Sequence, residues 1–122
     1  MKRPIIGFCL FFFIAASWGV GAWDQIDYQR LMATKKCVKC DLTEAYLSGA
    51  DLVFTNLSGA DLSGADLTEA YLFYTNLSTA DLSGADLNEV NLSAANLEGA
   101  NLTETSFCET KMPNGTINNS SC

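Results

Sequence analysis

The sequence predicts an all-β fold in which the chain winds into a coil, a β-helix. An apolar residue returns at every fifth position from Leu42 to Met112 without interruption, and a small residue, usually alanine, lies two positions before it. An α-helix advances about 100° per residue and a strand alternates its side chains with period two, so neither keeps a five-residue stripe on one face over this length. A chain that turns a corner after every five residues does.

A longer sequence repeat gives the number of five-residue units, here called walls, in one turn of the coil. Residues 52–71 match the residues 20 positions later at 14 of 20 positions, whereas displacements of 5, 10 and 15 give 9, 6 and 8 matches. Four walls therefore make one turn, and residues 20 apart are expected to stack at a strand spacing of roughly 4.8 Å. Backbone N–H and C=O groups then pair between successive turns, with each central leucine and its alanine pointing inward.

The beginning of the chain has the pattern of a secretory signal peptide. Lys2 and Arg3 precede an apolar run over residues 5–20, and the small residues at its end suit cleavage before Trp23. A membrane anchor is the alternative, but the run is shorter than the roughly 20 residues of a spanning helix and no basic stop follows it. We therefore predict a signal peptide over residues 1–22 and no membrane association after its cleavage.

Residues 23–39 are predicted to form a capping helix and a linker at the N-terminal end of the coil. Asp24 can cap the first turn of the helix, and Ile26, Leu31 and Met32 can share part of one face. So short a helix is marginal alone, but repeat arrays need atypical terminal units, which gives it a place to pack. A frayed tail is the alternative.

Four cysteines remain after signal cleavage, one pair at each end of the repeat: Cys37, Cys40, Cys108 and Cys122. An even number in an exported protein indicates two disulfides, with three possible connectivities. Bridging Cys40 to Cys108 would span about three turns, roughly 14 Å, beyond the ~7 Å limit between bridged Cα atoms. Residues 113–122 are predicted to form a C-terminal capping tail. The turn at residues 113–115 is expected to reverse the chain direction, so that Cys122 can form a disulfide with Cys108.

The Cys-x-x-Cys motif at Cys37 and Cys40 is predicted to be structural, either a local disulfide or buried thiols. A thioredoxin-like redox centre needs this motif at the start of a helix in a βαβ unit, and a zinc site needs a second pair of ligands nearby. The sequence around the motif offers neither context.

The run Ala-Asp-Leu-Ser-Gly-Ala-Asp-Leu-Thr-Glu-Ala at residues 60–70 resembles the pentapeptide-repeat family. The resemblance covers residues 40–112 and implies a right-handed quadrilateral β-helix, in agreement with the four walls inferred above. Residues 107–116 also resemble the terminal segment of exported bacterial and cyanobacterial members. Together with the signal peptide, this resemblance implies a periplasm, a thylakoid lumen or the extracellular space.

Composition disfavours catalysis and nucleic-acid binding. Without Lys2 and Arg3, the 14 carboxylates face 5 of the 7 basic side chains, a balance that repels DNA and RNA. The chain has no histidine, the commonest general base and transition-metal ligand, and a coil filled with leucine and alanine leaves no pocket. We therefore predict a noncatalytic exported module, a structural scaffold or a protein-interaction surface, without cofactor or metal.

One wall of the predicted coil carries outward aromatic and apolar side chains. These residues flank Leu52 and Leu72: Val53, Phe54, Tyr71, Phe73 and Tyr74. An exposed apolar patch often marks a partner site, so we predict that they bind an unknown protein partner. Alternatively, they stabilise the coil as cross-strand pairs, or the N-terminal segment covers them. The oligomeric state is left open.

Stacked carboxylates suggest a different class of function. Asp61 and Asp81 are 20 residues apart, as are Asp66 and Asp86. Some cytoplasmic members of the family are thought to act against gyrase by imitating the phosphates of DNA, so a DNA-mimic inhibitor of a topoisomerase is the alternative. The predicted export argues against it, and a solvated acidic face is the simpler account.

Overall fold

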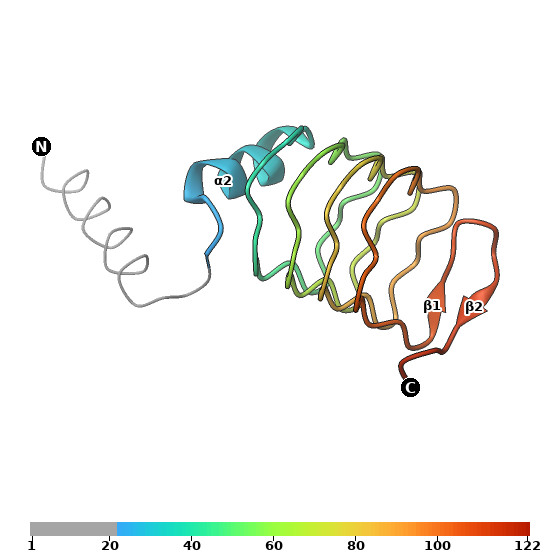
Figure 1. Ribbon diagram of the computed structural model, residues 1–122. Helices are drawn as coiled ribbons and strands as arrows, with labels where there is room; N and C mark the ends of the chain where they lie inside the picture. Colours follow the sequence, from blue (N-terminus) through green and yellow to red (C-terminus); the bar gives the residue numbers. More distant parts are fainter. Residues whose placement is uncertain (1–21) are drawn as a thin grey trace, which may run out of the picture.

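The computed structural model describes residues 22–122, so all but the last residue of the predicted signal peptide lies outside the described part. Helix α2 (Gln25–Thr34) comes first, a coil follows, and strands β1 (Thr110–Lys111) and β2 (Ile117–Asn118) close the chain. In Figure 1, α2 lies across one end of the coil and the β1–β2 hairpin lies at the other. Within residues 22–122, no helix combines the length and the apolar character needed to cross a membrane.

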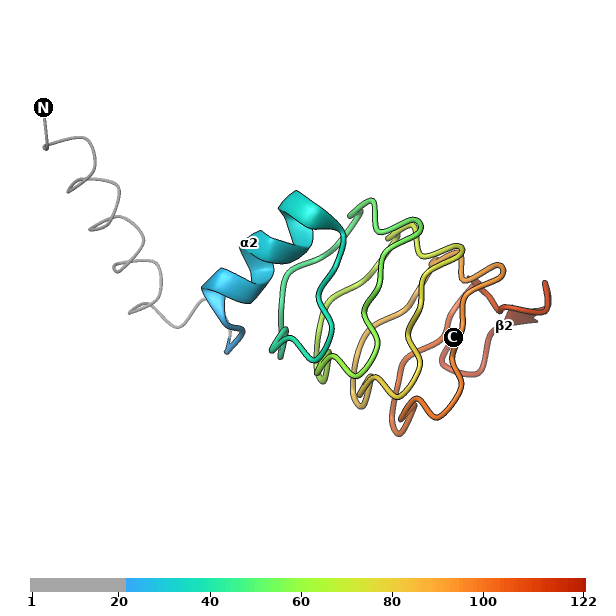
Figure 2. The same ribbon diagram turned by 90° about the horizontal axis from the view of Figure 1, so that it is seen from above.

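Residues 20 apart pair along the whole coil. Twelve parallel bridges run from Lys36↔Asn56 to Asn91↔Lys111, each with this spacing. Figure 2 shows the successive turns side by side. Because the chain turns after every five residues, the walls are isolated bridges rather than long strands. The predicted 20-residue turn of four five-residue units is observed.

The core of the coil holds one central side chain and one small side chain from each wall. Every central leucine from Leu42 to Leu92 is at most 1% exposed. Threonine replaces the alanine on several walls, and its hydroxyl is satisfied inside the coil. Thr75 Oγ1 donates to the Leu52 carbonyl at 2.7 Å, and Thr110 Oγ1 donates to the Leu87 carbonyl at 2.8 Å. The buried hydroxyls therefore add cross-turn bonds instead of a desolvation cost.

Most corners depend on an Asp or Asn side chain and on a residue in the left-handed backbone region. Asp61 Oδ1 accepts hydrogen bonds from the Ser63 N–H at 3.0 Å and the Ser63 hydroxyl at 2.6 Å. The next residue, Gly64, has φ of 67°. The Asp/Asn, Ser/Thr and Gly positions of the repeat are therefore turn formers. This role was not predicted, although such residues favour turns.

Helix α2 begins as predicted but packs through a different face. Asp24 Oδ1 accepts from the N–H groups of Ile26 and Asp27 at 2.8 and 3.0 Å, the expected N-cap. Leu31 is fully buried, but Ile26 and Met32 are exposed. The predicted shared face of these three residues is wrong, because Asp27, Tyr28 and Leu31 make the contacts with the coil.

The N-terminal segment bonds to edge carbonyls of the first turn on three walls. The Asp41 carbonyl accepts from the Asp24 N–H at 3.0 Å, the Tyr46 carbonyl from Tyr28 Oη at 3.4 Å, and the Asp51 carbonyl from Lys35 Nζ at 2.8 Å. On the fourth wall, Thr34 Oγ1 lies 3.2 Å from the Lys36 carbonyl oxygen. Inside the coil, the equivalent carbonyls accept from the preceding turn. The segment therefore covers a strand edge that would otherwise be open.

The C-terminal tail forms the predicted return. Strands β1 and β2 are antiparallel, with Lys111 opposite Ile117, and Gly115 occupies the turn between them with φ of 88°. Beyond β2, the chain bonds back to the coil. The Phe107 N–H donates to Ser121 Oγ at 2.9 Å, and the Glu109 N–H donates to Asn119 Oδ1 at 2.7 Å.

Candidate interaction surface

The five predicted binding residues lie together on two successive turns of one wall, here called the aromatic wall: Val53, Phe54, Tyr71, Phe73 and Tyr74. Phe54 and Tyr74 are 72% and 57% exposed, and their rings stack with centroids 4.9 Å apart and planes at 8°. Tyr71 is also exposed and meets Phe73 edge to face at 6.5 Å. Val53 and Phe73 are half-buried. The 20-residue turn therefore converts two distant sequence segments into one aromatic surface.

The backbone of the coil holds this surface rigidly. The Phe54 N–H donates to the Phe73 carbonyl at 3.3 Å, and the Tyr74 N–H donates to the Ser93 carbonyl at 3.0 Å. Both aromatic residues occupy the corner position where other units have glycine, with φ of 57° and 59°. For a residue with a Cβ this conformation costs about 1 kcal/mol. The surrounding ladders compensate for this cost and fix the backbone from which the two rings project.

Charged and polar groups border the aromatic wall. Toward α2, Asp51 pairs with Lys35 at 3.3 Å, and the Val53 N–H bond and then Lys35 lower the pKa of the Asp51 carboxyl. On the next turn the wall continues with polar Asn91 and Ser93. The apolar surface therefore ends after two turns and has a polar rim.

Helix α2 does not cover the aromatic wall. The aromatic side chains of the N-terminal segment gather on the neighbouring wall, where the ring of Trp23, just before α2, lies 5.3 Å from Tyr46 and 5.8 Å from Tyr28 of the helix. The alternative in which the N-terminal segment covers the predicted residues is wrong for Phe54, Tyr71 and Tyr74, which stay exposed.

The four cysteines are joined within each pair. Cys37 is bonded to Cys40 and Cys108 to Cys122, with Cα atoms 5.3 and 4.9 Å apart. The first bridge lies within the first turn of the coil, whereas the second ties the C-terminal tail to the repeat. Disulfides are typical of oxidising compartments.

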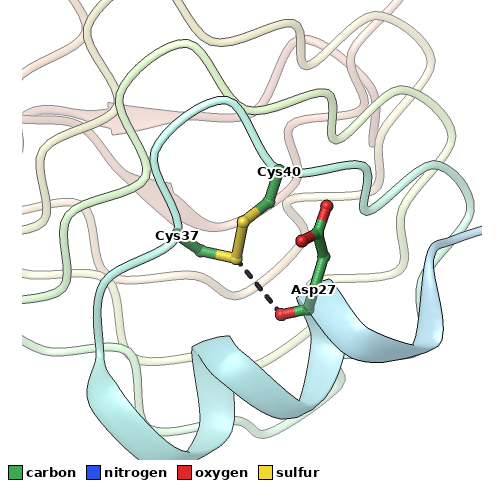
Figure 3. Close-up of side chains that lie close together, drawn as sticks. All are labelled: Asp27, Cys37 and Cys40. Atoms are coloured by element: carbon green, nitrogen blue, oxygen red, sulfur yellow. Dashed lines mark hydrogen bonds between the residues drawn. A yellow bond between two sulfur atoms is a disulfide. The ribbon is translucent and has the colours of Figure 1, made fainter.

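The first bridge lies in the interface between α2 and the coil, as Figure 3 shows. Cys37 Sγ is 3.2 Å from the Asp27 carbonyl oxygen, and Asp27 Oδ2 accepts from the Asp41 N–H at 2.8 Å. Ligand atoms of Asp27, Cys37 and Cys40 lie within 4.8 Å of one another, a spacing that could hold a metal. The bridged sulfurs are not thiolates, however, and the Asp27 oxygens already bond to Arg30 and Asp41. The bridged group is therefore a structural link between α2 and the coil, a role that was not predicted for Asp27.

The stacked aspartates are part of the corners. Asp61 bridges Asp81, and Asp66 bridges Asp86, but each carboxylate accepts a backbone hydrogen bond in its own unit. The Ser63 hydroxyl is the main cause that lowers the pKa of the Asp61 carboxyl. The repeat over residues 40–112 is nevertheless very acidic, with six aspartates and six glutamates against Lys111 alone.

Comparison with known families identifies the repeat. The family described as "Pentapeptide repeats" matches with eight copies, over residues 40–78, 54–88 and 75–114. The chain belongs to the pentapeptide-repeat family. Membership implies a right-handed β-helix, and proteins of this family are generally noncatalytic.

Solved pentapeptide-repeat structures are similar to this member of the family. A protein from the Arabidopsis thaliana thylakoid lumen is 38% identical over 62% of this chain and 53% of its own, with a TM-score of 0.60. The chain thus spans about half the length of that protein. HetL, involved in heterocyst differentiation regulation in the cyanobacterium Nostoc sp. strain PCC 7120, is 34% identical over 62% of this chain and 40% of its own, with a TM-score of 0.25.

A third structure, Rfr23 from the cyanobacterium Cyanothece 51142, is 23% identical over 75% of this chain and 97% of its own, with a TM-score of 0.43. A comparison with curated proteins found no match. The assignment to the pentapeptide-repeat family therefore describes the architecture and leaves the biological role to be proposed from the surface.

Proposed function

We propose that this pentapeptide-repeat protein is a noncatalytic, exported interaction module and that its aromatic wall binds a protein partner. The observation that carries the proposal is the Phe54–Tyr74 stack, two rings more than half exposed on a backbone that cross-turn hydrogen bonds join to the following turns. Aromatic side chains dominate the energetics of protein interfaces, and a preorganised surface loses little entropy when it binds.

The composition of the surface suggests the chemistry of the partner. Rings at the centre favour apolar or aromatic groups on the partner, and the polar rim at Asp51 and Asn91 can exclude water around them. The acidic repeat adds an attraction for basic surfaces.

The two disulfides and the similarity to a thylakoid-lumen protein support an extracytoplasmic location. In this proposal residues 1–22 are a signal peptide, residues 23–39 and 113–122 cap the two ends, and residues 40–112 form a quadrilateral scaffold. A periplasm, a thylakoid lumen and the extracellular space all satisfy the requirement for oxidised cysteines.

The proposal is tested by capture of partners from the protein's own extracytoplasmic compartment, with the wild type and a Phe54→Ser/Tyr74→Ser variant as baits. Because the central leucines are untouched, the variant should fold, and it should recover at least about tenfold less partner, as expected for loss of an aromatic hot spot. Glu69→Ser/Glu89→Ser is the matched control, since both glutamates are exposed corner residues with φ near 60°. Equal recovery by the aromatic variant would remove the aromatic wall from the account.

The density of carboxylates favours a second candidate, a DNA-mimic inhibitor of a topoisomerase such as gyrase. Twelve acidic side chains on one short coil imitate a polyanion better than the surface of an average protein does. This candidate requires the protein to share a compartment with the topoisomerase, so its cellular location separates the two.

A further inference from the structure

At the C-terminal end of the coil, two of the four walls keep an unpaired strand edge. Among residues 22–122, no hydrogen-bond partner is present for the N–H groups of Leu97, Gly99, Leu102 and Glu104, or for the carbonyls of Ala95 and Ala100. Leu97 and Leu102 are only half-buried, whereas the equivalent leucines in earlier turns are fully buried. The two remaining walls are sealed by β2 and by the Ser121 and Asn119 side chains.

The paired turns show what a strand on this edge would have to do. On a paired wall, the backbone N–H of Asp61 donates to the Cys40 carbonyl at 2.9 Å, and the Asp61 carbonyl accepts from the Leu42 N–H at 2.8 Å. The Ser63 carbonyl accepts from the Glu44 N–H at 2.8 Å. The side chain between them, Leu62, points into the core and is fully buried. A single extended tripeptide therefore pairs with all the free backbone N–H and C=O groups of one wall.

On the Leu97 wall, the same geometry defines an incoming tripeptide. Its first residue would bond to the Ala95 carbonyl and the Leu97 N–H, and its third residue would accept from the Gly99 N–H. Its second side chain would cover Leu97, so it must be apolar. The outer positions would lie beside Asn96 and the exposed Glu98, with Glu104 on the adjoining open wall, so basic residues suit them.

We propose that this edge, Ala95–Gly99, is a strand-addition site for an extended basic–apolar–basic segment of another protein. Charge argues against a second copy of this chain, because stacking two open ends would bring the Glu98 and Glu104 carboxylates of both copies together. The β1–β2 hairpin also occupies this end of the coil (Figure 1), which leaves less room for a second complete coil than for a single strand. The site is separate from the aromatic wall.

The probe is an N-acetylated, C-amidated Lys-Val-Lys-Val-Lys peptide, titrated into isotope-labelled protein (residues 23–122) and followed by amide chemical shifts and hydrogen exchange. We expect saturable binding with a Kd of about 0.1–1 mM, because few hydrogen bonds must offset the ordering of a flexible peptide. The amides of Leu97 and Gly99 should shift, and their exchange should slow about tenfold. A Glu-Val-Glu-Val-Glu peptide should not bind.

Glu98→Lys should weaken the basic peptide about tenfold and allow the acidic one to bind, since the exposed side chain can change without loss of a core contact. Glu69→Lys is the control, because it makes the same charge change at a residue whose own N–H is already bonded to the Asn88 carbonyl. It should leave the affinities for the basic and the acidic peptide unchanged. Absence of chemical-shift changes at about 1 mM peptide would overturn the proposal, as would changes confined to the aromatic wall or equal binding of both peptides. Shifts at the Ala95–Gly99 edge that depend on protein concentration alone would also overturn it, because they would indicate a second copy of the chain.

Discussion

At the scale of single residues, the consensus of the repeat divides into core formers and corner formers. The sequence could predict the core formers, because the five-residue stripe of leucine identifies them directly. It could also place the outward aromatic residues once the 20-residue turn was known. The corner role of Asp61 and its equivalents was missed, although an Asp or Asn two residues before a Ser or Thr and three before a Gly is a turn signal.

Asp61 allows the corner role to be tested separately from its charge. Asp61→Asn should change the free energy of unfolding at pH 7 by less than about 0.5 kcal/mol, because Asn76 makes the same bonds to Ser78. Asp61→Ala should cost about 1 kcal/mol, since the Ser63 N–H and hydroxyl lose their acceptor. Urea unfolding measures both differences.

The same pair of proteins gives a pH dependence. The pKa of the Asp61 carboxyl is lowered below its ordinary value of 3.8 in the folded state, chiefly by the Ser63 hydroxyl. Its contribution to stability is therefore complete above this ordinary value, which is the pKa of the unfolded chain, and is lost as pH falls through the lower folded pKa. Asp61→Asn should lose less stability than the wild type between pH 7 and about pH 3, by under 1 kcal/mol because solvent screens the group. An identical loss in both proteins would contradict this role.

At the scale of elements, α2 shows where sequence patterns stop being sufficient. Its existence and its Asp24 cap could be predicted from local chemistry. Its buried face could not, because tertiary contacts of Asp27 with Asp41 and of Trp23 with Tyr46 set the rotation of the helix. The C-terminal return was easier, since a Pro-Asn-Gly turn and a terminal cysteine both indicate it.

Leu31 is the residue through which α2 depends on the coil. Leu31→Ala should lower the free energy of unfolding by about 2–4 kcal/mol, because a fully buried side chain is removed. Hydrogen exchange at the Asp41 amide should increase, since its bond to Asp27 depends on the docked helix. Met32→Ala is the control, and its half-exposed side chain should cost under about 0.5 kcal/mol. Equal effects of the two substitutions would show that α2 is not held through Leu31.

At the scale of the whole molecule, the coil is predictable because every turn repeats one local solution. The two ends are not predictable in this way, because each has a structure that occurs once and has no repeating sequence pattern. The N-terminal edge is bonded to α2 and its flanking residues, whereas two walls at the C-terminal edge keep free N–H groups among residues 22–122. An acidic coil with an end capped by α2 is suited to presenting surfaces, and its aromatic wall and open edge are the two partner sites that we propose.

The central claim, an exported and oxidised module, is tested most directly by thiol trapping in cells. Cells are fractionated, free thiols are alkylated before any reduction, and the intact mass of the protein is measured in each fraction. The account predicts a chain beginning at Trp23 in the extracytoplasmic fraction, with Cys37, Cys40, Cys108 and Cys122 all unalkylated. A cytoplasmic chain that begins at Met1 and carries alkylated thiols would contradict it and favour the DNA-mimic alternative.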